Sequence, residues 1–168
     1  MNPVKYPYFA YGSNLSIHQM SKRCPGAIPI GWAELQQHRL EFRTNSKGRG
    51  VATVVPDFKS VVPGGIWLIT SQDLAKLDRF EGYPNLYTRI SLPVTYNQYW
   101  TTDVIVYIMT PGHRLVPPQN DYLDIIRNGY DDFGLDKGLL DIAVKSTKTR
   151  SGRGRKPKRG PGIISIFN

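Results

Sequence analysis

Cysteine is nearly absent from this sequence, and so are long apolar runs. Cys24 is the single cysteine, which excludes an internal disulfide and fits a reducing compartment. No apolar run approaches the roughly 18 residues that a transmembrane helix needs. Residues 1–5 contain no apolar core of the signal-peptide type. We therefore expect a cytoplasmic protein without membrane contact.

Patterns for metal and nucleotide binding are also missing. The three histidines have no metal-ligand spacing with one another or with Cys24. The glycine pairs at Gly48–Gly50 and Gly64–Gly65 lack the Lys-Ser/Thr or third glycine of nucleotide-binding loops, so they indicate turns. We expect no metal and no cofactor.

Acidic residues are absent after Asp141, although the chain carries a net charge of +9. Eight basic residues follow that position: Lys145, Lys148, Arg150, Arg153, Arg155, Lys156, Lys158 and Arg159. The rest of the chain has 14 basic and 13 acidic residues, so the charge belongs to the C-terminal end and not to the body. We expect a catalytic domain over residues 1–145 and a basic, Gly/Pro-rich tail over residues 146–168.

The composition of this tail predicts flexibility from Ser146 to Gly162. Residues 146–160 offer a contact for a polyanion such as nucleic acid, with a solvated, solubilising tail as the alternative. No aromatic residue is interleaved with the basic ones, so base stacking is not indicated. The apolar segment Ile163–Phe167 fits an added strand on the body and a partner contact equally well. The sequence carries no signal of oligomeric state.

The body predicts a strand-rich α+β domain, because short apolar and β-branched runs alternate with Gly, Pro and Asn breaks. Strands are predicted over residues 6–11, 27–30, 34–43, 51–55, 65–70, 87–95 and 103–109. Helices are predicted over residues 17–23, 71–80, 119–127 and 135–144, with Ser16 and Ser71 as N-caps of the first two.

Two short segments point to chemistry on a small acidic substrate. Tyr11-Gly12-Ser13-Asn14-Leu15 follows a buried strand and precedes a helix, so its N–H groups form a natural cradle for an anion. Gly12 allows this turn a positive φ and close approach of a ligand. Glu81 falls at the end of the helix over residues 71–80. The negative end of that helix dipole, and apolar cover from Phe80, Tyr83 and Tyr87, should raise the pKa of its carboxyl.

Several motifs, in order along residues 8–142, make the chain resemble the γ-glutamylcyclotransferases. They are Tyr11–Leu15, Gly50–Val54, Gly64–Trp67, Leu77-Asp78 with Glu81-Gly82, Tyr87, Val106–Thr110, and Pro117-Pro118-Gln119 before Tyr122. The resemblance implies a small β-barrel-like α+β fold and an enzyme that releases 5-oxoproline from γ-glutamyl amides. It also implies that Tyr11–Leu15 holds the γ-glutamyl group, that Glu81 is the acid/base, and that Tyr87 and Tyr122 contact the substrate.

Alternatives remain open for each of these residues. Glu81 also fits an exposed helix-terminal carboxylate, and the loop fits a plain structural turn. Tyr87 and Tyr122 fit core aromatics, and the polar side chains of Asn45, Arg43 and Arg89 are weaker candidates for substrate contact. A non-catalytic binding module of the same fold, whose basic tail binds nucleic acid or another polyanion, is the competing function. The motifs combine features of two branches of the family, so they do not fix the leaving amine or amino acid.

Overall fold

A computed structural model describes residues 4–153, and its centre is a closed five-stranded barrel. Around the barrel the strands are ordered β1-β3-β2-β4-β5, and a parallel pairing of β1 with β5 at Tyr8 and Ile105 closes it. The strands are β1 (Lys5–Ala10), β2 (Ile28–Thr44), β3 (Gly50–Thr70), β4 (Tyr87–Tyr96) and β5 (Trp100–Met109). The predicted α+β class and barrel-like sheet are therefore confirmed.

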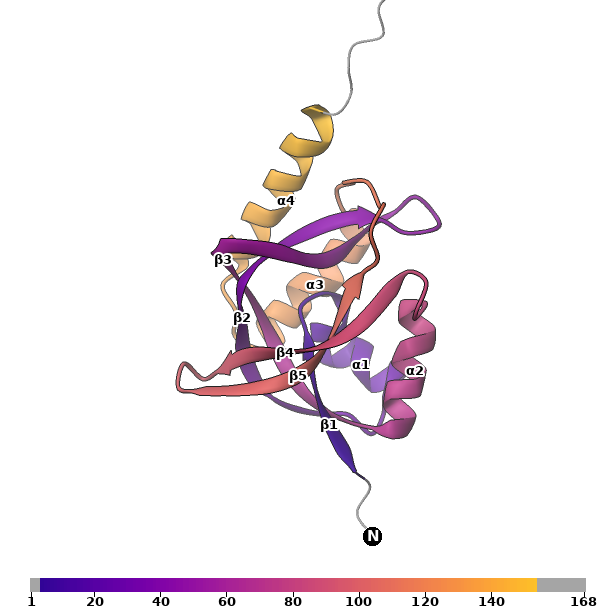
Figure 1. Ribbon diagram of the computed structural model, residues 1–168, viewed down its shortest axis with the longest axis vertical. Helices are drawn as coiled ribbons and strands as arrows, with labels where there is room; N and C mark the ends of the chain where they lie inside the picture. Colours follow the sequence, from indigo (N-terminus) through magenta and orange to yellow (C-terminus); the bar gives the residue numbers. More distant parts are fainter. Residues whose placement is uncertain (1–3, 154–168) are drawn as a thin grey trace, which may run out of the picture.

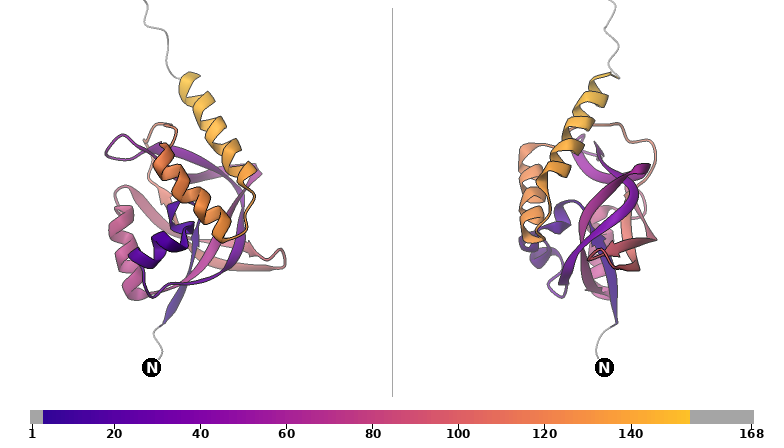
Figure 2. Two further views of the ribbon diagram at one scale, coloured as in Figure 1. Left: turned by 180° about the vertical axis from the view of Figure 1, so that it is seen from behind. Right: turned by 90° about the vertical axis from the view of Figure 1, so that its left-hand side faces the viewer.

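The helices lie outside this barrel. They are the one-turn η1 (Ser13–Leu15), α1 (Ile17–Arg23), α2 (Ser71–Glu81), α3 (Asn120–Asp132) and α4 (Lys137–Arg153). In Figure 1, α4 extends beyond the barrel, and the rear view in Figure 2 shows α1 and α3 covering one side. No helix within residues 4–153 is long and apolar enough to cross a membrane.

Four predicted strands are in fact two long ones. The predictions over residues 27–30 and 34–43 merge into the 17 residues of β2, and those over 51–55 and 65–70 merge into the 21 residues of β3. The two strands form one antiparallel hairpin whose register shifts between Pro29 and Gly31 and between Gln36 and His38. Bulges of this kind bend a strand without ending it, so the prolines within β3 do not break the sheet.

The helix starts follow local chemistry. The Ser16 hydroxyl accepts a hydrogen bond from the Gln19 N–H at 3.2 Å and caps α1 as predicted. The N-cap of α2 is Thr70, and not Ser71, because Thr70 and Asp73 form a reciprocal capping box. Gly82 ends α2 in the left-handed conformation with φ 64°, which glycine adopts at little cost.

The last helix is longer than predicted. α4 continues to Arg153. Its Thr147 is buried, and its Arg150 is bonded to the buried Glu41 of β2. The prediction of a flexible segment from Ser146 is therefore wrong as far as Arg153, and the folded unit runs past the expected boundary at residue 145. The apolar segment 163–167 and the rest of the basic tail lie outside the described residues.

Candidate active site

A hollow of about 310 Å³, part of it open to solvent, lies between the start of η1, the end of α2 and the barrel wall. Its lining consists of Tyr8, Tyr11, Gly12, Ser13, Asn14, Ala52, Glu81, Tyr87, Tyr107 and Tyr122. Seven of the eight predicted site residues are in this set, and Leu15 is the exception.

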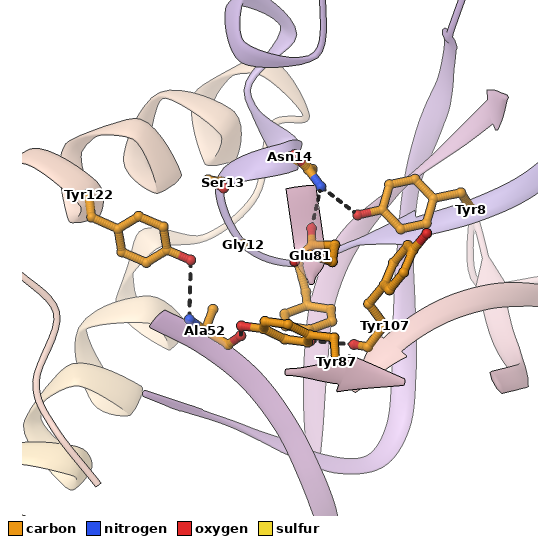
Figure 3. A pocket seen from close by; sticks show the side chains of 10 residues that line it. Tyr8, Gly12, Ser13, Asn14, Ala52, Glu81, Tyr87, Tyr107 and Tyr122 are labelled. Atoms are coloured by element: carbon orange, nitrogen blue, oxygen red, sulfur yellow. Dashed lines mark hydrogen bonds between the residues drawn. The ribbon is translucent and has the colours of Figure 1, made fainter. Parts of the chain in front are cut away.

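The predicted loop and the predicted carboxylate meet directly in this hollow. The Asn14 side-chain amide donates hydrogen bonds to Glu81 Oε1 and to the Tyr8 hydroxyl, each at 2.9 Å (Figure 3). In the sequence Asn14 lies 67 positions before Glu81 and 6 positions after Tyr8. The two segments therefore face the same hollow and not opposite sides of the molecule.

The fold brings the two segments together because β1 pairs antiparallel with β3, and α2, which ends at Glu81, follows directly after β3. Asn14 is buried, with 3% of its surface exposed, so its amide bonds are shielded from water.

Two details of the loop differ from the sequence prediction. Gly12 has φ −120°, so the expected positive φ is wrong. Glycine suits this position for a steric reason, since a Cβ here would lie 3.1 Å from Ala52 Cβ and 3.4 Å from the Tyr122 hydroxyl. Leu15 is fully buried, and its N–H donates to the Gly12 carbonyl at 3.0 Å, so it cannot serve in an amide cradle. The candidate cradle is therefore limited to the N–H groups of Gly12, Ser13 and Asn14.

Three of the five tyrosines use their hydroxyl hydrogens on the protein itself. Tyr11 donates to the Tyr107 carbonyl at 2.5 Å, Tyr87 to the Ala52 carbonyl at 2.6 Å, and Tyr107 to Asp78 Oδ1 at 2.6 Å. These bonds hold the walls of the hollow in place. Sequence reasoning missed Tyr107, whose position in an alternating strand reads as an ordinary core residue.

The hydroxyl groups of Tyr8 and Tyr122 instead accept hydrogen bonds from the protein. The Tyr8 hydroxyl accepts from Asn14, and the Tyr122 hydroxyl accepts from the Ala52 N–H at 3.1 Å. A hydroxyl that accepts an N–H keeps its own hydrogen for another acceptor. Tyr8 and Tyr122 can therefore donate to an oxygen atom bound in the hollow.

The weaker polar candidates lie elsewhere in the fold. Arg43 pairs with Glu41, and Arg89 lies 3.4 Å from Asp78. The Asn45 side chain accepts the N–H groups of Lys47 and Arg49 in a turn. None of the three lines the hollow.

Comparison with known proteins identifies the family. The family model described as "Gamma-glutamyl cyclotransferase, AIG2-like" matches residues 8–130. The γ-glutamylcyclotransferases of Bos taurus and Homo sapiens are each 32% identical over 136 residues, which cover 76% of this chain and 71% of each relative. The chain belongs to the γ-glutamylcyclotransferase family. A solved structure named "Gamma-glutamyl cyclotransferase" superposes with a TM-score of 0.75 at 27% identity, covering 96% of this chain and 94% of the other.

The surroundings of Glu81 place the pKa of its carboxyl group near neutrality, where it can both take up and release a proton. Burial raises the pKa of its carboxyl to about 7, against the opposing effects of the Arg23 charge and the Asn14 hydrogen bond. The cover differs from the predicted set, because the side chains of Phe80 and Tyr83 are exposed and only Tyr87 lines the hollow. The remaining cover comes from tyrosines of β1, β5 and α3.

Proposed function

We propose that this protein is a γ-glutamylcyclotransferase that converts a γ-glutamyl amide into 5-oxoproline and a free amine or amino acid. One observation carries the proposal: the carboxylate of Glu81 and the Gly12–Asn14 loop share a small hollow and are joined by a hydrogen bond. Family membership supports the reaction type, since the curated relatives carry the name of this activity.

Glu81 is the proposed acid/base. Its carboxylate takes a proton from the α-ammonium group of the substrate, and the resulting amine attacks the γ-carbonyl carbon. A base with a pKa near 7 suits this step at neutral pH better than an ordinary glutamate does. The C–N bond to the leaving group then breaks, and protonated Glu81 gives its proton to the departing nitrogen. The attacking nitrogen loses its second proton as the lactam forms, and the departing amine takes this proton and leaves as an ammonium ion. No proton and no cofactor is consumed overall.

The rest of the hollow supplies binding groups for this reaction. The N–H groups of Gly12, Ser13 and Asn14 suit either the α-carboxylate of the substrate or the oxyanion that forms on the γ-carbonyl. The free hydroxyl hydrogens of Tyr8 and Tyr122 can bond to the same kinds of oxygen. Tyr87 and Tyr11 act in this scheme by holding the walls of the hollow.

No feature of the described residues supports the alternative function, a non-catalytic binding module. A domain that had lost catalysis would not need a buried carboxylate with a raised pKa beside an intact loop. Contact of the basic tail with a polyanion is a separate proposal, because it does not depend on Glu81.

Glu81→Gln tests the proposed function. The wild-type protein is expected to release 5-oxoproline from at least one member of a panel of γ-glutamyl amino acids, γ-glutamylamines and glutathione, measured by mass spectrometry. Loss of the acid/base should lower kcat by about 100-fold to 10,000-fold. Glu34→Gln is the matched control, because Glu34 lies on β2 and does not line the hollow. Full turnover in Glu81→Gln contradicts the assignment, and a wild-type protein that cyclises no member of the panel contradicts the function.

A further inference from the structure

Arg23, the last residue of α1, contacts the loop that lines the hollow. Its Nη1 atom donates to Asn14 Oδ1 at 2.6 Å and to Ser13 Oγ at 3.3 Å. The guanidinium carbon also lies 4.8 Å from the centre of the Phe80 ring, which precedes Glu81 in α2. Arg23 therefore contacts both segments that carry the candidate chemistry, although it does not line the hollow.

The bond from Arg23 to Asn14 has a fixed direction. A guanidinium can only donate hydrogen bonds, and a side-chain amide accepts at oxygen and donates at nitrogen. With its oxygen on Arg23, the Asn14 amide must present its NH₂ group to the other side, where Glu81 and Tyr8 lie. The reversed amide would place NH₂ against the guanidinium and an oxygen against the carboxylate, so two bonds would become repulsive.

We propose that Arg23 is a positioning residue that fixes the direction of the hydrogen bonds in the active site, a role that rests on the proposed function. Held by Arg23, Asn14 donates to Glu81 and so fixes the carboxylate that must reach the α-ammonium group. Asn14 also donates to Tyr8, which leaves the Tyr8 hydroxyl hydrogen free for the substrate.

The charge of Arg23 acts on Glu81 as well. The other titratable groups that line the hollow with this carboxylate are the hydroxyls of Tyr8, Tyr11, Tyr87, Tyr107 and Tyr122, whose pKa values burial raises further above neutrality. These hydroxyls stay neutral at working pH. Arg23 is therefore the charged neighbour that opposes burial and holds the pKa of Glu81 near 7.

Kinetics of Arg23→Met and Arg23→Lys test this role, with the best substrate from the panel. Arg23→Met should move the acidic limb of the kcat/KM profile to higher pH by at least about half a unit and lower kcat by about 10-fold to 100-fold. Arg23→Lys keeps the charge and should keep the position of the limb, while its kcat falls because one ammonium cannot reproduce the guanidinium contacts. Lys22→Met is the control, since it removes an exposed charge from the same helix. The proposal is overturned if Arg23→Met keeps both the wild-type kcat and the wild-type position of the acidic limb. It is also overturned if Lys22→Met shifts this limb by the same amount.

A titration without substrate separates this proposal from the proposed function. The chain has three glutamates, so ¹³C-labelled carboxyl signals can be assigned by comparison with Glu81→Gln and Glu34→Gln. The Glu81 signal should titrate near pH 7 in the wild type, at higher pH in Arg23→Met and near the wild-type value in Arg23→Lys. An unchanged titration in a folded Arg23→Met protein overturns the role of Arg23. A shifted titration in a protein that forms no 5-oxoproline supports the placement of Arg23 and rejects the function.

Discussion

At the scale of single residues, the site places an ionisable group where ionisation is costly. Burial in a hollow lined by tyrosines raises the pKa of Glu81 from 4.5 to about 7. The folded protein therefore holds the Glu81 proton more tightly than the unfolded chain does. Between these two pKa values the native state binds more protons, so this group makes stability fall as pH rises. Well above pH 7 Glu81 is ionised in both states, and its full destabilising effect on the folded protein is reached.

Removing this charge should stabilise the protein at alkaline pH. Glu81→Gln should raise the free energy of unfolding at pH 8 by up to roughly 3 kcal/mol, the energy that corresponds to a shift of this size. Near pH 4 the two proteins should be about equally stable, because Glu81 is then protonated in both states. Urea denaturation at both pH values measures the difference. A gain of the same size at both would show that packing, and not the charge, is responsible.

Residue patterns predicted part of this site and missed the rest. Glu81 and Asn14 could be found because a helix end and a strand-turn-helix junction are local features. Arg23 and Tyr8 could not, since a basic residue in the last turn of a helix and an aromatic residue in a strand are ordinary in any fold. Their roles arise from side-chain contacts with Asn14 and, for Arg23, with Phe80 of α2. Residue type and local pattern do not specify which side chains meet in this way.

At the scale of elements, the barrel depends on strands longer than local signals suggest. Pro56 and Pro63 led to a predicted break in β3, yet both are paired with β2, opposite His38 and Glu34. The strand type and location were predictable from β-branched residues, whereas strand continuity depended on the tertiary pairing of the hairpin.

One ionic cluster joins α4 to this hairpin. Glu41 of β2 is almost fully buried and bonds to Arg39, Arg43 and Arg150. Burial alone would raise the pKa of Glu41, but the hydrogen bonds from Arg150, Arg39 and Arg43 together hold it below its usual value. The cluster therefore stabilises the fold above the unfolded-state pKa of glutamate and loses this effect as pH falls through the native value.

Arg150→Met should loosen α4 without reaching the active site. We expect a loss of about 1 kcal/mol in the free energy of unfolding at pH 7, because two arginines remain on Glu41 and Arg150 is itself partly exposed. The loss should shrink as pH falls and Glu41 becomes protonated. Urea denaturation at pH 7 and pH 3 measures both values. Arg153→Met, an exposed position at the end of the same helix, is the control and should change neither.

At the scale of the whole molecule, the candidate catalytic residues and the basic C-terminal end belong to different parts of the chain. The hollow lies between β1, η1, α2 and α3, and no residue after Tyr122 in the described part of the sequence lines it. Four of the eight basic residues after Asp141 belong to α4, and one of these, Arg150, is bonded to Glu41. The other four are Arg155, Lys156, Lys158 and Arg159.

Because of this separation, we expect enzymatic activity to be independent of any contact between the basic tail and a polyanion. A chain ending at Arg153 should keep the kcat, KM and melting temperature of the full protein, because residues 4–153 contain the barrel, the hollow and the whole of α4. Its binding to a short DNA duplex should weaken, and the slope of log K against log salt should fall by up to about 3 to 4 if all four removed cations contact phosphates. Fluorescence anisotropy over a salt series measures the slope, and Glu81→Gln in the full chain is the control that should bind DNA normally. Loss of turnover on truncation would place residues 154–168 in the catalytic unit, whereas unchanged DNA binding would exclude them as the polyanion contact.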